Sequence, residues 1–423
     1  MKIHFIGIGG IGVSALAQYY LEKGHEVTGF DFASSEITDY LKKKGVSFKK
    51  DIPNDTNLII HTSAISPSDS KLTDAMSRGI EIMSYPEALG ELTKQYFTVA
   101  VSGTHGKSTT TSMVALIMIN AGLDPSVIIG TKLKEFGNTN FRAGNSKYLV
   151  IEADEWNRSF LNYWPRIIVL TSIEKEHMDT YKDMEDIMDT YGKYIEHLSL
   201  EGVLVANGDD LNIANLKIGE QVKIQKYSLN QEDAAKVRSI LKVPGEHNVS
   251  NALAALSVSR QLGIPDEKAF EALSSFKGSW RRFQEKRLKL GIKNLTLVSD
   301  YGHHPTEIKA TLDAALQKFP KKKIWCVFQP HQHQRTHYLF NDFVKVFSSS
   351  GIDRVIITDI YDVAGREKKE IKRKVSSRKL VKSIGKENVI YLKKENIISY
   401  LKKNIAGKEI LILMGAGDIY TLL

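Results

Sequence analysis

Strand-like and helix-like segments alternate along the sequence, and this alternation restricts the possible folds more than any other feature. Short apolar runs, including 2–7 (KIHFIG), 97–103 (FTVAVSG) and 409–415 (EILILMG), have the length and composition of buried strands. Helical patterns such as 13–24 (VSALAQYYLEKG) lie between such runs. Strands that alternate with helices form parallel sheets with helices on both faces. The sequence therefore predicts an α/β protein.

The length of 423 residues fits three such units in series, at roughly 100–200 residues for each domain. A new apolar strand begins near residue 96, and the alternation restarts after 278–284 (GSWRRFQ). We therefore predict a Rossmann-like domain at 1–93, a central domain of P-loop ATPase type at 94–279, and a second Rossmann-like domain at 280–423. In the central domain we expect a parallel sheet with helices on both faces.

Charge and composition exclude several classes of protein. The 58 Lys and Arg outnumber the 49 Asp and Glu, but the basic clusters at 42–44, 321–323 and 366–374 are far apart and lack interleaved aromatic residues. We interpret them as solvated faces and expect no nucleic-acid partner. Cys326 is the only cysteine, so an internal disulfide is excluded. Residues 1–12 contain a glycine-rich turn and no long apolar run follows, which predicts a cytoplasmic protein without membrane insertion.

The first glycine-rich turn, GIGGIG at 7–12, follows a predicted strand and opens a predicted helix. Backbone N–H groups at a helix N-terminus bind pyrophosphate, and glycines let the phosphate approach the backbone. Asp31 ends the next predicted strand, where a carboxylate can accept a hydrogen bond from a ribose hydroxyl. Taken alone, the pattern predicts a dinucleotide site; the alternative is a tight turn that needs glycine only for its backbone.

The second glycine-bearing loop is more specific, because it lies between an apolar strand and a helical pattern that ends at Gly122. Gly-Lys-Ser at the start of a helix offers N–H groups and an ammonium to nucleoside phosphates, and a hydroxyl to Mg²⁺. Val101 stands where the standard GxxxxGK[ST] spacing has its first glycine. The candidate phosphate-binding residues are Gly103, Thr104, His105, Gly106, Lys107, Ser108 and Thr109.

Polar residues follow two of the predicted strands of the central domain. Glu152, Asp154 and Glu155 end the run YLVIEADE, and Glu174 and His177 come after RIIVLTSI. The carboxyl ends of parallel strands form the ligand-binding edge of an open α/β sheet. These carboxylates beside a phosphate loop predict a Mg²⁺ site, in which histidine would be an unusual ligand.

Eight motifs in a fixed order resemble those of the ATP-dependent Mur ligases of peptidoglycan synthesis. They are GTHGKSTTTS, EADE, IEKEHMDTY, GEHNVSNALAA, GSWRRFQ, DYGHHPTE, FQPHQHQRT and MGAGDIY, and together with GIGGIG they span nearly the whole chain. The resemblance implies that the N-terminal domain binds a UDP-sugar, the central domain binds ATP, and the C-terminal domain binds the amino acid and closes over ATP. It also implies ATP and Mg²⁺ as cofactors, and no nicotinamide.

The activity that the resemblance implies is the joining of L-alanine to the lactyl carboxylate of UDP-N-acetylmuramate through an acyl phosphate. We expect these small molecules as partners, and a monomer or homodimer. One alternative is a related ligase that attaches a tripeptide to the same sugar nucleotide. A nicotinamide-dependent oxidoreductase would explain GIGGIG and Asp31 but leaves the second loop unexplained. A non-catalytic nucleotide sensor would not need Lys107, Glu152 and His177 together.

By motif, the resemblance implies that Lys107 contacts the β- and γ-phosphates, and that Mg²⁺ is bound by Ser108, Glu152 and His177. It implies that further contacts to ATP come from Asn248, Asn251, Arg282 and Asp300. The implied contacts to the UDP-sugar are Gly9, Gly10, Ile11, Gly12, Asp31, Ser63 and, in a loop after the ATP helix, Asn140.

Near the incoming amino acid, the resemblance implies His303, His304, His331 and Arg335. A guanidinium binds a carboxylate in a bidentate way, so Arg335 is the expected clamp. One of the three histidines would accept the amine proton, and the sequence does not choose among them. The candidate catalytic residues are Lys107, His177, His304, His331 and Arg335, and His303 is a candidate for substrate binding.

The sequence departs from the family pattern at three places. His333 and Gln334 replace an aromatic residue and a Ser or Thr, Ser172 stands where Asn is common, and the segment between 226 and 248 is short. We therefore expect a different wall in the amino-acid pocket and a trimmed central domain. Lys193 follows His177 at the position where some relatives carry a carbamylated lysine, and we interpret it as a solvated helix residue.

Overall fold

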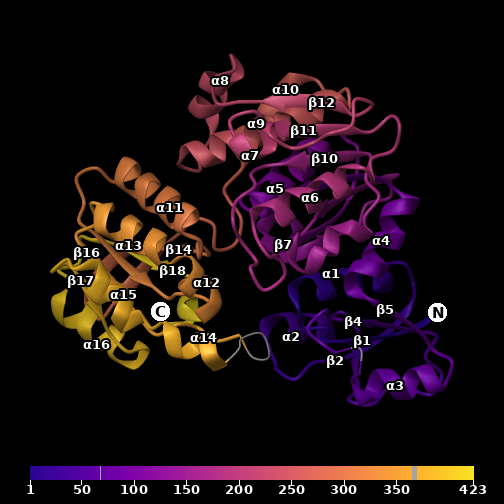
Figure 1. Ribbon diagram of the computed structural model, residues 1–423, viewed down its shortest axis with the longest axis horizontal. Helices are drawn as coiled ribbons and strands as arrows, with labels where there is room; N and C mark the ends of the chain where they lie inside the picture. Colours follow the sequence, from indigo (N-terminus) through magenta and orange to yellow (C-terminus); the bar gives the residue numbers. More distant parts are fainter. Residues whose placement is uncertain (67, 364–368) are drawn as a thin grey trace. The chain divides into compact units, whose positions relative to one another are not determined.

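The computed structural model describes residues 1–66, 68–363 and 369–423, and Figure 1 shows its helices and strands. The described chain divides into two compact units. The first unit comprises Met1–Glu174, Met184–Ile240 and Ser250–Ser275, and the second comprises Lys175–Asp183, Leu241–Val249 and Phe276–Leu423. The predicted basic cluster at 366–374 begins outside the described residues, and the rest of it forms α14 (Lys369–Lys374).

The first sheet has five parallel strands in the order β3-β2-β1-β4-β5. This order is that of the first half of a Rossmann fold continued by two strands on the other side of β1, so the Rossmann-like prediction is confirmed. The strands are β1 (Lys2–Ile6), β2 (Glu26–Phe30), β3 (Ser47–Phe48), β4 (Leu58–His61) and β5 (Glu81–Ser84). The helices are α1 (Ile11–Glu22), α2 (Glu36–Lys43), α3 (Ser70–Ser77) and α4 (Tyr85–Gln95).

The second sheet has seven strands in the order β12-β11-β10-β6-β9-β7-β8. All neighbouring strands are parallel, as predicted, except β8, which returns antiparallel to β7 at the edge. The strands are β6 (Phe97–Ser102), β7 (Ser126–Leu133), β8 (Thr139–Arg142), β9 (Tyr148–Glu152), β10 (Ile167–Leu170), β11 (Val203–Asn207) and β12 (Lys223–Tyr227). The helical segments are α5 (Lys107–Asn120), η1 (Lys134–Phe136), η2 (Trp156–Asn162), α6 (Met184–Ile195), α7 (Leu211–Ala214), α8 (Asp233–Ile240), α9 (Glu246–Gln261) and α10 (Asp266–Ser275).

The third sheet has six strands in the order β13-β14-β18-β15-β16-β17. β13 (Gln284–Leu290) pairs antiparallel with β14 (Lys293–Asp300) through a turn in which Gly291 has a φ of +64°. The other strands are parallel: β15 (Ile324–Phe328), β16 (Arg354–Ile357), β17 (Val389–Tyr391) and β18 (Ile410–Met414). The helical segments are α11 (Pro305–Lys318), α12 (His333–Tyr338), α13 (Phe340–Ser349), α15 (Ser377–Ile384), α16 (Lys394–Asn404) and η3 (Ile419–Thr421).

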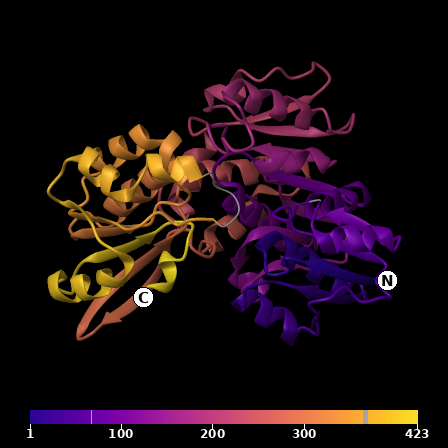
Figure 2. The same ribbon diagram turned by 60° about the horizontal axis from the view of Figure 1, so that its bottom comes forward.

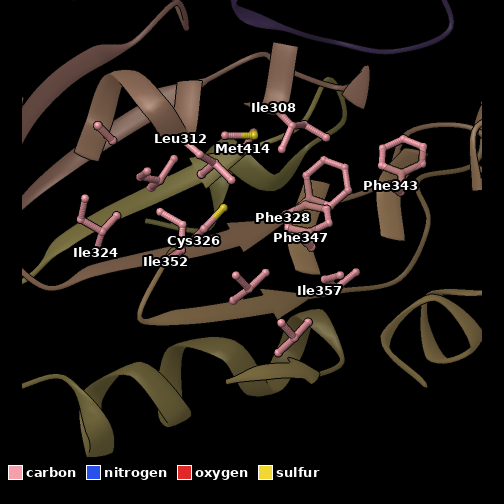
Figure 3. Close-up of a cluster of buried hydrophobic side chains, with 14 of the residues drawn as sticks. Ile308, Leu312, Ile324, Cys326, Phe328, Phe343, Phe347, Ile352, Ile357 and Met414 are labelled. Atoms are coloured by element: carbon pink, nitrogen blue, oxygen red, sulfur yellow. The ribbon is translucent and has the colours of Figure 1, made fainter. Parts of the chain in front are cut away.

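Successive residues of β15 pack into different cores, so helices cover both faces of the third sheet, as Figure 2 also shows. Cys326 and Phe328 belong to a core that α11 and α13 complete, and Figure 3 shows this cluster. Trp325 and Val327 belong to a second core with Ile397 of α16. The apolar run in β15 therefore reflects burial on both sides, as expected for a parallel sheet.

Three sheets in the described chain confirm the predicted three-domain α/β fold class. The domain boundaries at 93/94 and 279/280 stay predictions. In the chain, α4 connects the last strand of the first sheet to the first strand of the second, and it begins with a capping box of Ser84 and Glu87. Across the described ranges, the structure contains no helix with both the length and the apolar character needed to cross a lipid bilayer.

Candidate functional site

The first glycine turn joins β1 to α1, and Asp31 lies directly against it. The Gly9 N–H donates to Asp31 Oδ2 at 2.8 Å, and a Cβ on Gly9 would lie 2.8 Å from the same oxygen. Gly7 has a φ of +78°, and a Cβ there would clash with Thr62. The structure therefore brings the turn and Asp31 together, and one N–H of the turn is already bonded to the carboxylate.

The start of α1 packs closely against the start of α4. Gly10 is the N-cap of α1, and a Cβ on Gly12 would lie 2.7 Å from Cζ of Tyr85. Burial first, and then the charges of Glu152 and Asp154, raise the pKa of Tyr85, so its phenol stays protonated. Ile11 opens the helix, and Ser63 follows β4 as a half-buried residue.

The side chain of Asn140, on β8, is fully engaged by α1. It donates to Ser14 Oγ at 3.0 Å and to the carbonyl of Ile11, and it accepts from Gln18 Nε2 at 3.0 Å. Asn140 is 4% exposed. These bonds fix β8 against α1, and contact of Asn140 with a UDP-sugar stays a prediction.

The phosphate-type loop runs from β6 to α5, and glycine is required at both of its bends. Gly103 and Gly106 have φ values of +125° and +83°. A Cβ at Gly103 would lie 2.2 Å from Thr171 Oγ1, and one at Gly106 would lie 2.3 Å from Asn251 Oδ1. Ser172 supports the loop, because its carbonyl accepts from the Thr104 N–H at 2.8 Å and its hydroxyl from the His105 N–H at 3.0 Å.

Lys107, the first residue of α5, forms a buried ion pair with Glu155. Its Nζ lies 2.8 Å from Glu155 Oε2 and donates to the carbonyl of Gly103 at 2.7 Å. The side chains are 14% and 4% exposed. Burial lowers the pKa of Lys107, but the carboxylates of Glu155, Asp154 and Glu152 outweigh burial and raise it above its ordinary value. The ammonium is therefore charged and held in the loop.

Ser108 and Glu152 meet at the carboxyl end of β9. Ser108 Oγ donates to Glu152 Oε1 at 3.0 Å, and the Gly130 N–H donates to Oε2 at 2.9 Å. The hydroxyl and the carboxylate are oxygen donors, the kind that Mg²⁺ prefers. His177, the third predicted ligand, belongs to the second unit and has a φ of +53°.

The two asparagines predicted to contact ATP lie one turn apart on α9. Asn251 Oδ1 accepts from Thr110 Oγ1 at 3.2 Å, beside Gly106 of the loop. Asn248 Nδ2 donates to the carbonyl of Pro244 at 2.6 Å, within the second unit. Both side chains are buried, and their contact with ATP stays a prediction.

In the second unit, Asp300 ends β14 and orders the junction before β13. Its Oδ2 accepts from the Phe283 N–H at 2.8 Å and its Oδ1 from the Gly302 N–H at 2.7 Å. Arg282 lies 3.6 Å from Glu307. The sequence reading missed Arg281, which is buried, donates to the carbonyl of Gly415 and stacks over Tyr420 at 4.2 Å.

Arg335, the predicted carboxylate clamp, is paired with Glu176 inside the second unit. Its Nε lies 2.9 Å and 3.0 Å from the two carboxylate oxygens, and the side chains are 5% and 9% exposed. Burial alone raises the pKa of Glu176, but Arg335 and then His177 outweigh it and hold that pKa far below its ordinary value.

A small, partly open pocket lies beside this ion pair. One wall is the segment 175–179, which includes Glu176 and His177, and the other comes from α12 and the residues around it. Gln332 and Gln334 both line the pocket, and Gln332 has a φ of +70°. Gln334 is one of the two positions of the FQPHQHQRT motif at which the sequence departs from the family pattern, and Gln332 directly precedes them.

The structure also assigns places to residues whose roles the sequence did not define. Glu155 pairs with Lys107, Glu176 pairs with Arg335, and Glu307 caps α11. Of these three roles, the sequence indicates only that of Glu307, through the capping-box pattern HPTE. Lys193 lies on α6, 58% exposed and 2.8 Å from Asp189. This geometry agrees with a solvated helix lysine.

Comparison with protein families matches almost the whole chain. The "Mur ligase family, catalytic domain" matches residues 2–97, the "Mur ligase middle domain" matches 101–259, and the "Mur ligase, glutamate ligase domain" matches 281–417. A protein of Acetivibrio thermocellus named UDP-N-acetylmuramate–L-alanine ligase is 39% identical over 448 residues, covering 99% of this chain and 94% of the relative.

Two solved structures have a similar fold over the full length. The UDP-N-acetylmuramate-alanine ligase of Thermotoga maritima aligns with a TM-score of 0.80 and 27% identity, covering 100% of this chain and 97% of that one. A murein peptide ligase of Psychrobacter arcticus aligns with a TM-score of 0.72 and 22% identity over the same shares, which shows likeness of fold.

Proposed function

Because this chain belongs to the Mur ligase family, we propose that it joins L-alanine to UDP-N-acetylmuramate at the expense of ATP. The observation that carries the proposal is the presence of two glycine-bearing turns in one compact unit. Asp31, the proposed partner of a ribose, lies against one turn, and Lys107, the proposed partner of phosphates, lies in the other. A ligase of this kind needs one turn for the sugar nucleotide and one for ATP.

The chemical task is to activate the lactyl carboxylate, which is a poor acyl donor because its leaving group would be oxide. A carboxylate oxygen attacks the γ-phosphorus, the bond to the β-phosphate oxygen breaks, and ADP leaves. Lys107 offsets charge on the transferring phosphoryl group, an electrostatic and positional role. Glu155 must release the ammonium for this role, since it holds Lys107 in the structure described here.

The residues at the end of β9 fit Mg²⁺ by the chemistry of their donors. Ser108 Oγ and Glu152 Oε1, 3.0 Å apart, would hold the ion, and His177 is a further ligand predicted from sequence. When bound, Mg²⁺ neutralises charge on phosphate oxygens. Tyr85, at the start of α4, lies against Gly12 and feels the charge of Glu152, so this residue stands near both turns of the first unit.

For the amino acid, we propose that Arg335 binds the carboxylate through Nη2. Its Nε is engaged by Glu176 and its Nη1 by His331, whereas Nη2 has no hydrogen-bond partner within the described chain. A small pocket adjoins this pair and is lined by residues 175–179 and by the residues around α12. L-alanine is the proposed acceptor, with glycine, L-serine and the tripeptide of the related ligases as the alternatives that the test compares.

The test uses purified protein with UDP-N-acetylmuramate, ATP and Mg²⁺. ADP and phosphate should appear in amounts equal to the amide, and only when the amino acid is added. L-alanine, glycine, L-serine and the tripeptide are compared as acceptors, and a preference for the tripeptide would reassign the substrate. Release of ADP without the sugar nucleotide would contradict the ligase, and reduction of NAD would favour the oxidoreductase. Cell fractionation tests the further proposal that the enzyme is cytoplasmic.

A further inference from the structure

Three histidines of the second unit surround the predicted amino-acid site, and their hydrogen bonds distinguish them chemically. A neutral imidazole has one N–H donor and one nitrogen lone pair. When Nδ1 accepts a hydrogen bond, the proton is on Nε2; when Nδ1 donates, the lone pair is on Nε2. Only a histidine of the second kind can take a proton at Nε2.

His304 has its proton on Nε2. It is the N-cap of α11, and its Nδ1 accepts the backbone N–H of Thr306 at 3.3 Å. Accepting this bond requires the Nδ1 lone pair, so the outer nitrogen carries the proton. Nε2 of a neutral His304 can therefore donate a hydrogen bond but cannot accept a proton.

His331 has the same tautomer for a different reason. Its Nδ1 lies 3.1 Å from Nη1 of Arg335. A guanidinium has no acceptor, so Nδ1 of His331 must accept this bond. His331 also stacks on Tyr361, with the ring centroids 5.5 Å apart, which fixes its plane.

His303 has the opposite tautomer. Its Nδ1 lies 3.2 Å from the carbonyl oxygen of Tyr301 and 3.2 Å from Glu307 Oε2, and both are acceptors. The proton is therefore on Nδ1, and Nε2 carries the lone pair. Within the described chain, Nε2 of His303 has no hydrogen-bond partner.

The surroundings of His303 keep the imidazole neutral and orient it. Burial lowers the pKa of His303 to about 3, and Glu307 opposes this effect. Glu307 is fixed at the start of α11, where its Oε2 accepts the backbone N–H of His303 at 3.0 Å and, in the capping box, the backbone N–H of His304 at 3.5 Å. A carboxylate behind the Nδ1–H holds the ring and stabilises the imidazolium when a proton arrives at Nε2.

We propose that His303 is the base that accepts a proton from the incoming amine, and that Glu307 is its positioning residue. The inference rests on the proposed function. The ammonium of the amino acid gives one proton to Nε2 of His303, and the nitrogen lone pair forms the bond to the acyl carbon. The bond from that carbon to the phosphate oxygen breaks, and the leaving phosphate takes the second proton from nitrogen. His303 then returns its proton to water.

The position of His303 suits this step. Its ring centroid is 6.1 Å from that of His331, and His331 contacts Arg335, the proposed carboxylate clamp. In an α-amino acid the amine and carboxylate are joined to the same carbon. A carboxylate bound at Arg335 would therefore hold the amine close to the cluster that contains His303 and His331.

The test compares two acceptors in a His303→Gln variant. L-alanine must lose a proton before it attacks, whereas hydroxylamine is already neutral at pH 7 and traps the acyl phosphate as a hydroxamate. The variant should lose at least about 100-fold in the rate with L-alanine and stay within about threefold of wild type with hydroxylamine. Glu307→Gln should show the same split to a smaller degree, whereas a merely structural role would lower both rates together.

His337→Gln is the matched control, because it makes the same change on α12 outside the proposed machinery, and it should leave both rates unchanged. An alanine rate within about threefold of wild type, or equal loss with both acceptors, would overturn the assignment. Nitrogen-15 NMR of the wild-type protein gives a test that does not depend on any variant folding. It should find the Nδ1–H tautomer at His303, and the Nε2–H tautomer there would overturn the proposal. Failure of the wild type to form hydroxamate would instead contradict the proposed function.

Discussion

Each compact unit holds its main cation in a buried pair with a glutamate, but the two pairs differ in kind. Lys107 presents a compact ammonium to one oxygen of Glu155 and to loop carbonyls. Arg335 presents a planar fork: Nε reaches both oxygens of Glu176, and Nη1 reaches His331. An ammonium can exchange partners by rotating its stem, whereas a guanidinium must break several bonds in one plane.

The comparison indicates that Lys107 must exchange its partner during the reaction, whereas Arg335 can keep its partner. The Lys107 pair can open when phosphate arrives, because phosphate offers the ammonium similar hydrogen bonds. The Arg335 pair can remain closed, since Nη2 still offers two N–H donors. We therefore expect changes at the first pair to affect turnover, and changes at the second to affect stability and amino-acid binding.

The largest effect should come from Lys107→Ala. Loss of the ammonium removes charge stabilisation from phosphoryl transfer, and turnover should fall by roughly 1000-fold or more. Binding of UDP-N-acetylmuramate, measured by calorimetry, should change little. Equal loss of both would contradict the division of labour between the two glycine turns. Thermal melting serves as the control, because Glu155 loses its partner in this variant.

Glu176→Ala should reduce stability by about 3–5 kcal/mol, since it leaves the Arg335 charge buried without its carboxylate. Because the folded-state pKa of Glu176 is lowered, its stabilisation is present above the ordinary value of 4.5 and is lost as pH falls below it. Denaturant unfolding from pH 7 to pH 3 should therefore show a steeper loss in the wild type than in Glu176→Gln. Parallel curves would rule out the ion pair as the source.

Arg335→Lys tests whether the planar guanidinium, rather than its charge alone, is needed for amino-acid binding. A lysine keeps the charge but cannot bond Glu176, His331 and a substrate carboxylate in one plane. The KM for L-alanine should rise by roughly 10- to 100-fold, with the KM for ATP nearly unchanged. A matching rise in both values would mean that Arg335 does not act on the amino acid specifically.

The smallest effect should follow Glu155→Gln, which keeps the shape of the side chain and removes its charge. Lys107 would then be released more readily, and the KM for ATP should fall by roughly two- to fivefold, although the buried ammonium loses its carboxylate and stability should fall as well. Asp124→Asn, a change of the same type at an ion pair with Arg142, is the matched control. A rise in the KM for ATP would indicate that Glu155 helps to bind the nucleotide.

The sequence predicts those parts of the fold that depend on local patterns. Buried strands, helix starts and the two glycine turns each occupy one short stretch, so β6, α5 and Gly106 lie where they were expected. Ser108 and Glu152 could be brought together from sequence because the carboxyl ends of parallel strands share one edge.

The partners of the cations could not be predicted, for a physical reason. Glu155 is one of three acids within four residues, and the local sequence pattern does not distinguish which of them pairs with Lys107. Glu176 and Arg335 are 159 residues apart, and their pairing depends on tertiary packing. The antiparallel edge strands β8 and β13 were also missed, because their pairing depends on hairpin geometry within an otherwise parallel pattern.

The antiparallel strand β13 has a consequence for how copies of this chain meet one another. It forms the border of the third sheet, and Glu285, Lys286, Arg287 and Lys289 are exposed along it. An edge strand has unpaired backbone N–H and C=O groups, which can pair with a strand of another molecule and lead to aggregation. Charged side chains along the edge strand make this pairing unfavourable. The charged side chains of β13 therefore oppose edge-to-edge pairing of the six-stranded sheet with the same sheet of another copy.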